Sequence, residues 1–117
     1  KMKFYYYPKC STCQKAKKWL ESHQLDFEAI DITQVRPTKE EFLTLFEKSG
    51  YESKKFFNTS GILYREGNYK EKLAKLSDSE RADILASEGM LVKRPLLIKN
   101  DKVLLGFKEE NYLSLLD

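Results

Sequence analysis

The hydrophobic and polar positions in the first third of the chain predict a strand, a helix and a second strand. Residues 3–7 form an aromatic-rich run, ended by Pro8, that we expect to be a strand buried on both faces. From residue 11 to about residue 23, apolar side chains recur at helical spacing on one face. Residues 26–32 alternate and predict a second strand. The two strands should therefore be parallel, with a right-handed crossover.

The middle of the chain shows helical patterns only. Thr38 with Glu41, and Ser77 with Glu80, have the spacing of a capping box, in which two residues satisfy each other's free backbone amides at a helix start. The first predicted helix ends at Ser49-Gly50 and the second near Gly89, and residues 69–76 predict a short helix between them. Residues 56–61 are an apolar pair running into a polar turn.

The last quarter predicts a hairpin and a final helix. Arg94-Pro95 precedes a strand at 96–98, a turn at Asn100-Asp101 and a strand at 103–105. The final helix should carry Tyr112, Leu113 and Leu116. We therefore expect an α/β protein with a thioredoxin-like fold, in which helices flank a mixed four-stranded sheet. Residues 1–117 should form a single domain, with a helical insertion at about 38–90 between its βαβ and ββα halves.

Composition and charge then narrow the class of protein. The chain has 117 residues, of which 41% are hydrophobic and 33% charged, and its net charge is +3. This mild charge does not argue for direct nucleic-acid binding, and no apolar run reaches the roughly 18–20 residues that cross a bilayer. The first residues do not form an export signal. We expect a cytoplasmic protein, where a cysteine pair is more often catalytic, redox-sensing or metal-binding than structural.

The only two cysteines, Cys10 and Cys13, lie where the first strand gives way to the first helix. Unpaired amides and the helix dipole favour negative charge there, which typically lowers a cysteine pKa from roughly 8.5 to about 3.5–7.5. We expect Cys10 to be a partly ionised nucleophile, helped by Lys9 and Lys15, and Cys13 to be its resolving thiol. A zinc site would need about four ligands, so we expect no metal. Two unreactive thiols are the remaining alternative.

Other residues are candidates to bind substrate beside Cys10. Arg94 would lie near the sulfur if Pro95 packs against it, and would stabilise a thiolate or bind an oxyanion. Asn58 is a candidate to hydrogen-bond a bound anion. Ser11 and Thr12, at the helix start, complete the predicted anion-binding set.

Three motifs together resemble the arsenate reductase (ArsC)/Spx family. They are Tyr-x-x-Pro-x-Cys ending at Cys10, Phe-Asn-Thr-Ser-Gly at 57–61 and Lys-Arg-Pro-Leu at 93–96. The similarity covers essentially the whole chain and is greatest to uncharacterised arsenate-reductase-like members. It implies a thioredoxin-like core, a nucleophile at Cys10, a cis-proline at Pro95 and no bound cofactor. An external thiol donor such as glutaredoxin, thioredoxin or glutathione would then reduce the pair.

The resemblance implies two alternative functions. Arsenate reductases hold their oxyanion with three arginines. Arg94 matches one, whereas Asn58 and Gly106 stand at the other two positions, so we expect weak arsenate binding and instead a thiol–disulfide oxidoreductase. The Cys-x-x-Cys pair is also similar to that of Spx, a redox-sensing regulator that binds the α subunit of RNA polymerase. In that contact Spx has a glycine where this chain has Glu52.

Overall fold

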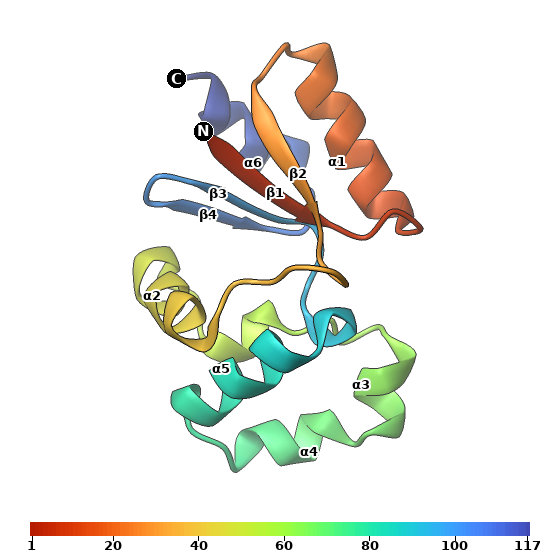
Figure 1. Ribbon diagram of the computed structural model, residues 1–117, viewed down its shortest axis with the longest axis vertical. Coiled ribbons are helices and arrows are strands. Elements are labelled where there is room, and N and C mark those ends of the chain that lie inside the picture. Colours follow the sequence, from red (N-terminus) through yellow and green to blue (C-terminus); the bar gives the residue numbers. More distant parts are fainter.

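The computed structural model describes all 117 residues. The N-terminal half consists of β1 (Met2–Tyr6), α1 (Ser11–Ser22) and β2 (Phe27–Asp31). The C-terminal half consists of β3 (Leu96–Lys99), β4 (Lys102–Leu105) and α6 (Glu109–Tyr112). Between the halves lie α2 (Lys39–Ser49), α3 (Ile62–Glu66), α4 (Tyr69–Ala74) and α5 (Asp78–Ser87), which gather on one side of the sheet (Figure 1).

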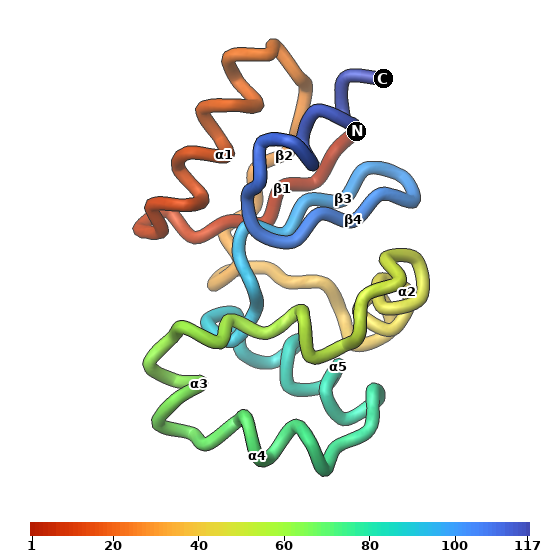
Figure 2. Tube along the Cα trace, turned by 180° about the vertical axis from the view of Figure 1, so that it is seen from behind, coloured from red at the N-terminus to blue at the C-terminus, as the bar shows by residue number.

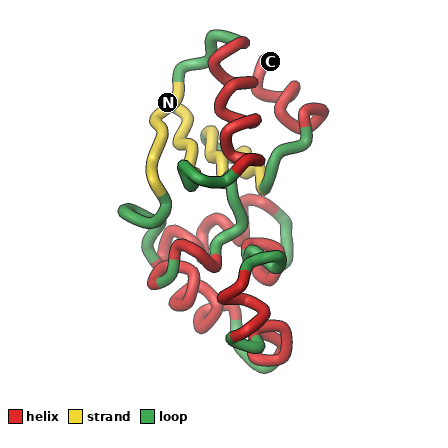
Figure 3. Tube along the Cα trace, turned by 90° about the vertical axis from the view of Figure 1, so that its right-hand side faces the viewer, coloured by secondary structure: helices red, strands yellow, loops and turns green.

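The four strands form one mixed sheet in the order β2-β1-β3-β4. β1 runs parallel to β2, with Met2 opposite Phe27, and antiparallel to β3, with Tyr5 opposite Leu96. β3 and β4 form an antiparallel hairpin. Figure 3 shows the strands with helices on both sides. The predicted thioredoxin-like fold and the parallel pairing of the first two strands are confirmed.

The sheet is buried on both faces because β1 alternates between two hydrophobic clusters. Phe4 points toward α1 and α6, where it packs with Trp19, Leu97 and Tyr112. Tyr5 points to the opposite face and belongs to the larger cluster that the α2–α5 segment builds. The sheet therefore joins two cores, and the N-terminal end of α1 lies where β1 leaves the sheet.

Local sequence signals account for most helix ends. Both capping boxes form: the Thr38 hydroxyl accepts from the Glu41 amide at 3.1 Å, and Ser77 accepts from Glu80 at 3.2 Å. Gly50 then ends α2 with a left-handed backbone, φ 71°. No pattern in the sequence predicts α3, because none of its residues is fully buried and only Tyr64 packs, partly buried, against the larger cluster.

The last helix differs from its prediction. α6 tightens into a 3₁₀ turn, Leu113–Leu116, which buries Tyr112 and Leu115 and leaves Leu113 and Leu116 about half exposed. Of the three residues expected on this helix only Tyr112 is buried, because the tighter turn rotates later residues differently from an α-helix. No helix in the chain has both the length and the apolar character that crossing a bilayer requires.

Candidate active site

Cys10 is the residue that caps the N-terminus of α1. It has an extended backbone, and its amide donates to the Tyr7 carbonyl at 3.0 Å, closing the turn that follows β1. Its sulfur accepts a hydrogen bond from the Cys13 amide, with an N–S distance of 3.4 Å. The half-buried sulfur therefore takes the place of the side-chain oxygen that usually caps a helix. It accepts a hydrogen bond from one of the backbone amides that have no partner within the first turn.

The two thiols have opposite acid–base properties. Partial burial alone would raise the pKa of Cys10, but hydrogen bonds from the Cys13 side chain and amide, together with the charge of Arg94, bring that pKa below its usual value. Cys13 is fully buried, and burial is the main reason that its pKa rises to about 12. Cys10 therefore ionises to a thiolate more readily than an ordinary cysteine, whereas Cys13 remains a protonated thiol.

Arg94 lies beside Cys10, as expected. Its Nη1 donates to the Met90 carbonyl at 3.1 Å, and its guanidinium carbon lies 5.3 Å from the centre of the Tyr7 ring. Its Nε is buried and has no hydrogen-bond partner in the chain. The Arg94–Pro95 peptide bond is cis, as the family resemblance implied. The cation acting on the thiolate is therefore Arg94 rather than Lys9 or Lys15, which sequence adjacency had suggested.

Cys10 opens onto a cleft of about 640 Å³, which we call the cysteine cleft. In Figures 1 and 2 the start of α1 lies on the same side of the molecule as α3, with the segment leading to β3 between them. The cleft is lined by four cations and by no carboxylate; the cations are Lys55, Lys93, Arg94 and Lys108. Such a site favours anions.

The structure brings most of the predicted site residues together. Thr12 and Asn58 line the cysteine cleft with Cys10 and Arg94, whereas Cys13 lies buried beneath it and Ser11 is exposed outside it. The Asn58 amide donates to the Leu91 carbonyl at 2.8 Å, and its side-chain oxygen accepts from the Ser60 hydroxyl at 3.1 Å. The chain contains no group of three His, Cys, Asp or Glu residues arranged to hold a metal ion.

Three lysines of the cleft were missed as site residues. Lys55, Lys93 and Lys108 come from segments far apart in the sequence, so their convergence depends on the tertiary fold. Only Lys93 carried a usable signal, because it directly precedes the Arg94-Pro95 pair.

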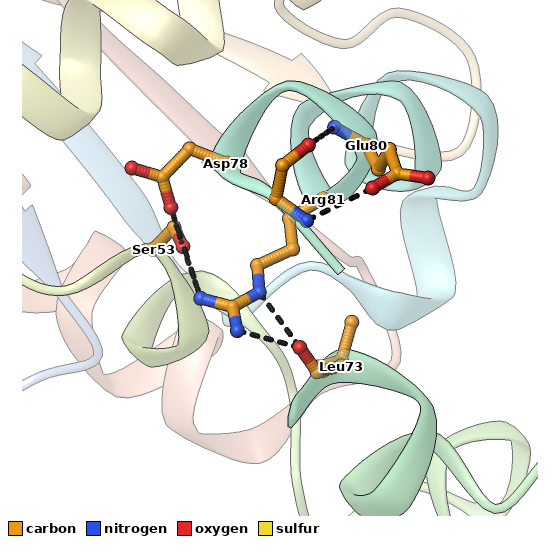
Figure 4. Close-up of polar contacts among 6 residues, drawn as sticks. Ser53, Leu73, Asp78, Glu80 and Arg81 are labelled. Atoms are coloured by element: carbon orange, nitrogen blue, oxygen red, sulfur yellow. Dashed lines mark hydrogen bonds and ion pairs between the residues drawn. The ribbon is translucent and has the colours of Figure 1, made fainter. Parts of the chain in front are cut away.

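The wall that carries Tyr51 and Lys55 is held by a polar network. It includes a 3₁₀ helix, Ser53–Phe56, which contains Lys55, and Ser53 is a buried polar residue at 3% exposure. The Ser53 hydroxyl donates to Asp78 at 2.6 Å and accepts from Arg81 Nη1 at 2.9 Å (Figure 4). Arg81 Nε also donates to the Leu73 carbonyl at 3.0 Å. These bonds tie the wall to α4 and α5.

Comparisons with known proteins show which family the chain belongs to. YusI of Bacillus subtilis (strain 168), an uncharacterised protein, is 56% identical over 109 residues, covering 93% of this chain and 92% of YusI. The regulatory protein MgsR of the same organism is 27% identical over 112 residues, covering 96% of this chain and 87% of MgsR. A crystal structure from Streptococcus mutans UA159, described as a possible arsenate reductase, is 48% identical with a TM-score of 0.87, over 94% of this chain and 95% of the other. A sequence model of the ArsC family matches residues 5–115, and the chain therefore belongs to the ArsC family.

Proposed function

We propose that this protein is a thiol–disulfide oxidoreductase in which Cys10 attacks a disulfide and Cys13 resolves the product. The observation that carries the proposal is the difference between the two sulfurs within one helical turn. One faces the cysteine cleft with a lowered pKa, and the other is fully buried with a pKa near 12. Thiol exchange needs an accessible thiolate to attack and a second thiol close by to release the mixed disulfide.

The reaction consists of two successive thiol–disulfide exchange steps. The Cys10 thiolate forms a bond to one substrate sulfur, the substrate S–S bond breaks, and the other half leaves as a thiolate. Cys13 then loses its proton, attacks the Cys10 sulfur and expels the second thiolate. The substrate is thereby reduced by two electrons and the pair is oxidised to a disulfide, which an external thiol donor such as glutaredoxin, thioredoxin or glutathione would reduce.

The high pKa of Cys13 is compatible with this second step. Burial is its largest cause, but the hydrogen bond and the negative charge of Cys10 also raise it. Both of these contributions from Cys10 end when its sulfur enters the mixed disulfide. Cys13 therefore becomes more acidic at the stage at which it must ionise.

The test is the rate at which each thiol is alkylated as a function of pH, measured by mass spectrometry of labelled peptides. Cys10 should react as a thiolate well below the free-thiol pKa of about 8.5, while Cys13 should stay protected. The variants C10S and C13S assign each rate to one sulfur. A Cys10 profile with its midpoint near the free-thiol value would overturn the proposal.

A regulatory function is the second candidate, and one structural observation favours it. Tyr51 and Lys55 line the cysteine cleft and flank the exposed Glu52 and Lys54. A change at Cys10 is therefore adjacent to a surface that a protein could bind, and MgsR is a regulatory protein. A pull-down with the C-terminal domain of the RNA polymerase α subunit, in reduced and in oxidised protein, decides this. The absence of binding in both states removes this candidate.

A further inference from the structure

We propose that Lys93, which folds over Gly106, makes the cysteine cleft selective for small disulfides that carry carboxylate or phosphate groups. This inference rests on the proposed exchange at Cys10 and adds its substrate class. It assigns a specificity-determining role to a lysine that does not touch the reacting sulfurs. The supporting observations are the packing of Lys93, the charge of the cleft and its size.

The Lys93 side chain packs over the backbone of Gly106. Gly106 has φ +74°, and a Cβ placed there would lie 3.3 Å from Lys93 Cε and 4.0 Å from Lys93 Nζ. The lysine stem therefore packs so closely over Gly106 that even a Cβ at this position would press against it. Both backbones are held, since the Lys93 amide donates to the Phe56 carbonyl at 2.7 Å and the Gly106 amide donates to the Pro95 carbonyl at 2.9 Å.

The cations of this cleft are not paired with carboxylates of the protein. None of the four ion pairs in the structure includes Lys55, Lys93, Arg94 or Lys108. With Cys10 ionised, four cations face one anion, so the cleft keeps a positive excess. A concave site lined by one sign of charge raises the local concentration of oppositely charged molecules.

The size of the cleft favours a small molecule over an extended chain. Its volume of about 640 Å³ lies within the roughly 300–1,000 Å³ typical of small-molecule sites. Its other polar groups include Thr12, Asn58 and Asn111, which can donate to carboxylate or phosphate oxygens. A disulfide with acidic groups on both halves would place one of them near Lys93 while its sulfur meets Cys10.

The experiment compares three disulfides of different charge. They are 5,5′-dithiobis(2-nitrobenzoate), which is anionic, 4,4′-dithiodipyridine, which is neutral, and cystamine, which is cationic. The initial rate of thiol release with each is divided by its rate with β-mercaptoethanol, which removes the intrinsic reactivity of the reagent. We expect the normalised rate for the anionic disulfide to exceed that for the neutral one by about tenfold at low salt, and to approach it at high salt.

Variants of Lys93 then test the assignment. Lys93→Ala should lower the ratio of anionic to neutral rates by about threefold or more, and Lys93→Glu should lower it further. Lys93→Arg keeps the charge and should preserve the ratio. Lys75→Ala removes the same charge from an exposed position outside the cleft and should preserve the ratio. Equal ratios in Lys93→Ala and Lys75→Ala, or a wild-type protein without charge preference, would overturn the inference while leaving the exchange reaction in place. A Cys10 that reacts with none of the three disulfides would instead overturn the proposed function.

Discussion

Two clefts lie where the α2–α5 segment meets the sheet, and they differ in the charges that line them. The cysteine cleft contains four cations and no carboxylate. The second, of about 360 Å³, lies between β1 and α2, and we call it the sheet cleft. Its lysines are accompanied by carboxylates; the charged residues that line it are Lys1, Lys3, Lys48, Glu40 and Glu41.

The two clefts also differ in the acidity of the group that each contains. In the sheet cleft, burial raises the pKa of Tyr5, and the charges of Glu41 and Glu28 raise it further, so the phenol stays neutral. In the cysteine cleft, Cys13 and Arg94 outweigh partial burial and lower the pKa of Cys10. The comparison teaches that hydrogen bonds from Cys13, together with an arginine beside the sulfur, distinguish the candidate active site, whereas a hollow alone does not.

The largest effect should follow from removing the nucleophile. C10S should abolish release of thiolate from added disulfides, because a hydroxyl at this position is not ionised at neutral pH. C13S is the matched variant, and it should keep the first exchange but accumulate the mixed disulfide, seen by intact-mass spectrometry. If C10S still releases thiolate at the wild-type rate, the cysteine cleft has no special reactivity and the comparison with the sheet cleft fails.

Removing the cation beside the sulfur should have the next largest effect. Arg94→Met should raise the pKa of Cys10 and lower its alkylation rate just below neutral pH by about tenfold, which corresponds to roughly one pKa unit. The pH dependence of alkylation should shift to higher pH, while the rate at alkaline pH, where the thiolate is fully formed, stays closer to wild type. A loss of rate of the same size at every pH would point to a structural effect instead.

The buried thiol should make stability depend on alkaline pH. Cys13 keeps its proton in the folded state up to about pH 12, whereas the unfolded chain loses it near the ordinary thiol value. The unfolded state therefore binds fewer protons from about pH 9 to pH 12, and folding should lose up to about 1.4 kcal/mol per pH unit from this group. The lowered pKa of Cys10 has the opposite sign, with stability gained above its ordinary value and lost as the pH falls through its folded value.

Urea unfolding at several alkaline pH values checks this prediction. Cys13→Ala should lose stability less steeply than wild type above about pH 9, because the group that must ionise on unfolding is gone. Parallel pH dependences in the two proteins would contradict the burial of an un-ionised thiol at this position.

The smallest effect should come from altering the sheet cleft. Lys48→Met removes a cation whose ammonium lies 3.8 Å from the Asp101 carboxylate, in a largely exposed pair. We expect the alkylation rate of Cys10 to stay within about twofold of wild type, since exposed charges far from a site are screened by salt. A change as large as that of Arg94→Met would mean that the two clefts are coupled and that net charge alone governs reactivity.

Sequence reasoning succeeded where the determinants are local. The capping boxes at Thr38 and Ser77 and the cysteines at the start of α1 each depend on residues within a few positions of one another. The βαβ pattern likewise follows from the short periodic run within each of its elements. It missed α3, none of whose residues is fully buried, and the change to a 3₁₀ turn at Leu113–Leu116. Periodicity detects only helices that face a core in a regular register.

The candidate site was predictable in part for the same reason. Cys10 and Cys13 were predicted from their spacing at the start of a helix, and the position of Arg94 followed from the expected thioredoxin-like fold. The room that Gly106 leaves for Lys93 could not be read from the chain, because residues 93 and 106 meet only after the β3–β4 hairpin has folded. The unpaired charge of the cysteine cleft is likewise a property of the folded molecule.

The capping role of Cys10 couples its oxidation to the stability of the first turn of α1. The same sulfur that would attack a disulfide accepts the amide of Cys13 and so holds the first turn of α1. A sulfur engaged in a disulfide is neutral and a poorer acceptor, so oxidation should loosen this turn and let it fray. Faster amide hydrogen exchange over residues 11–14 would then report the redox state directly in the dynamics of the backbone.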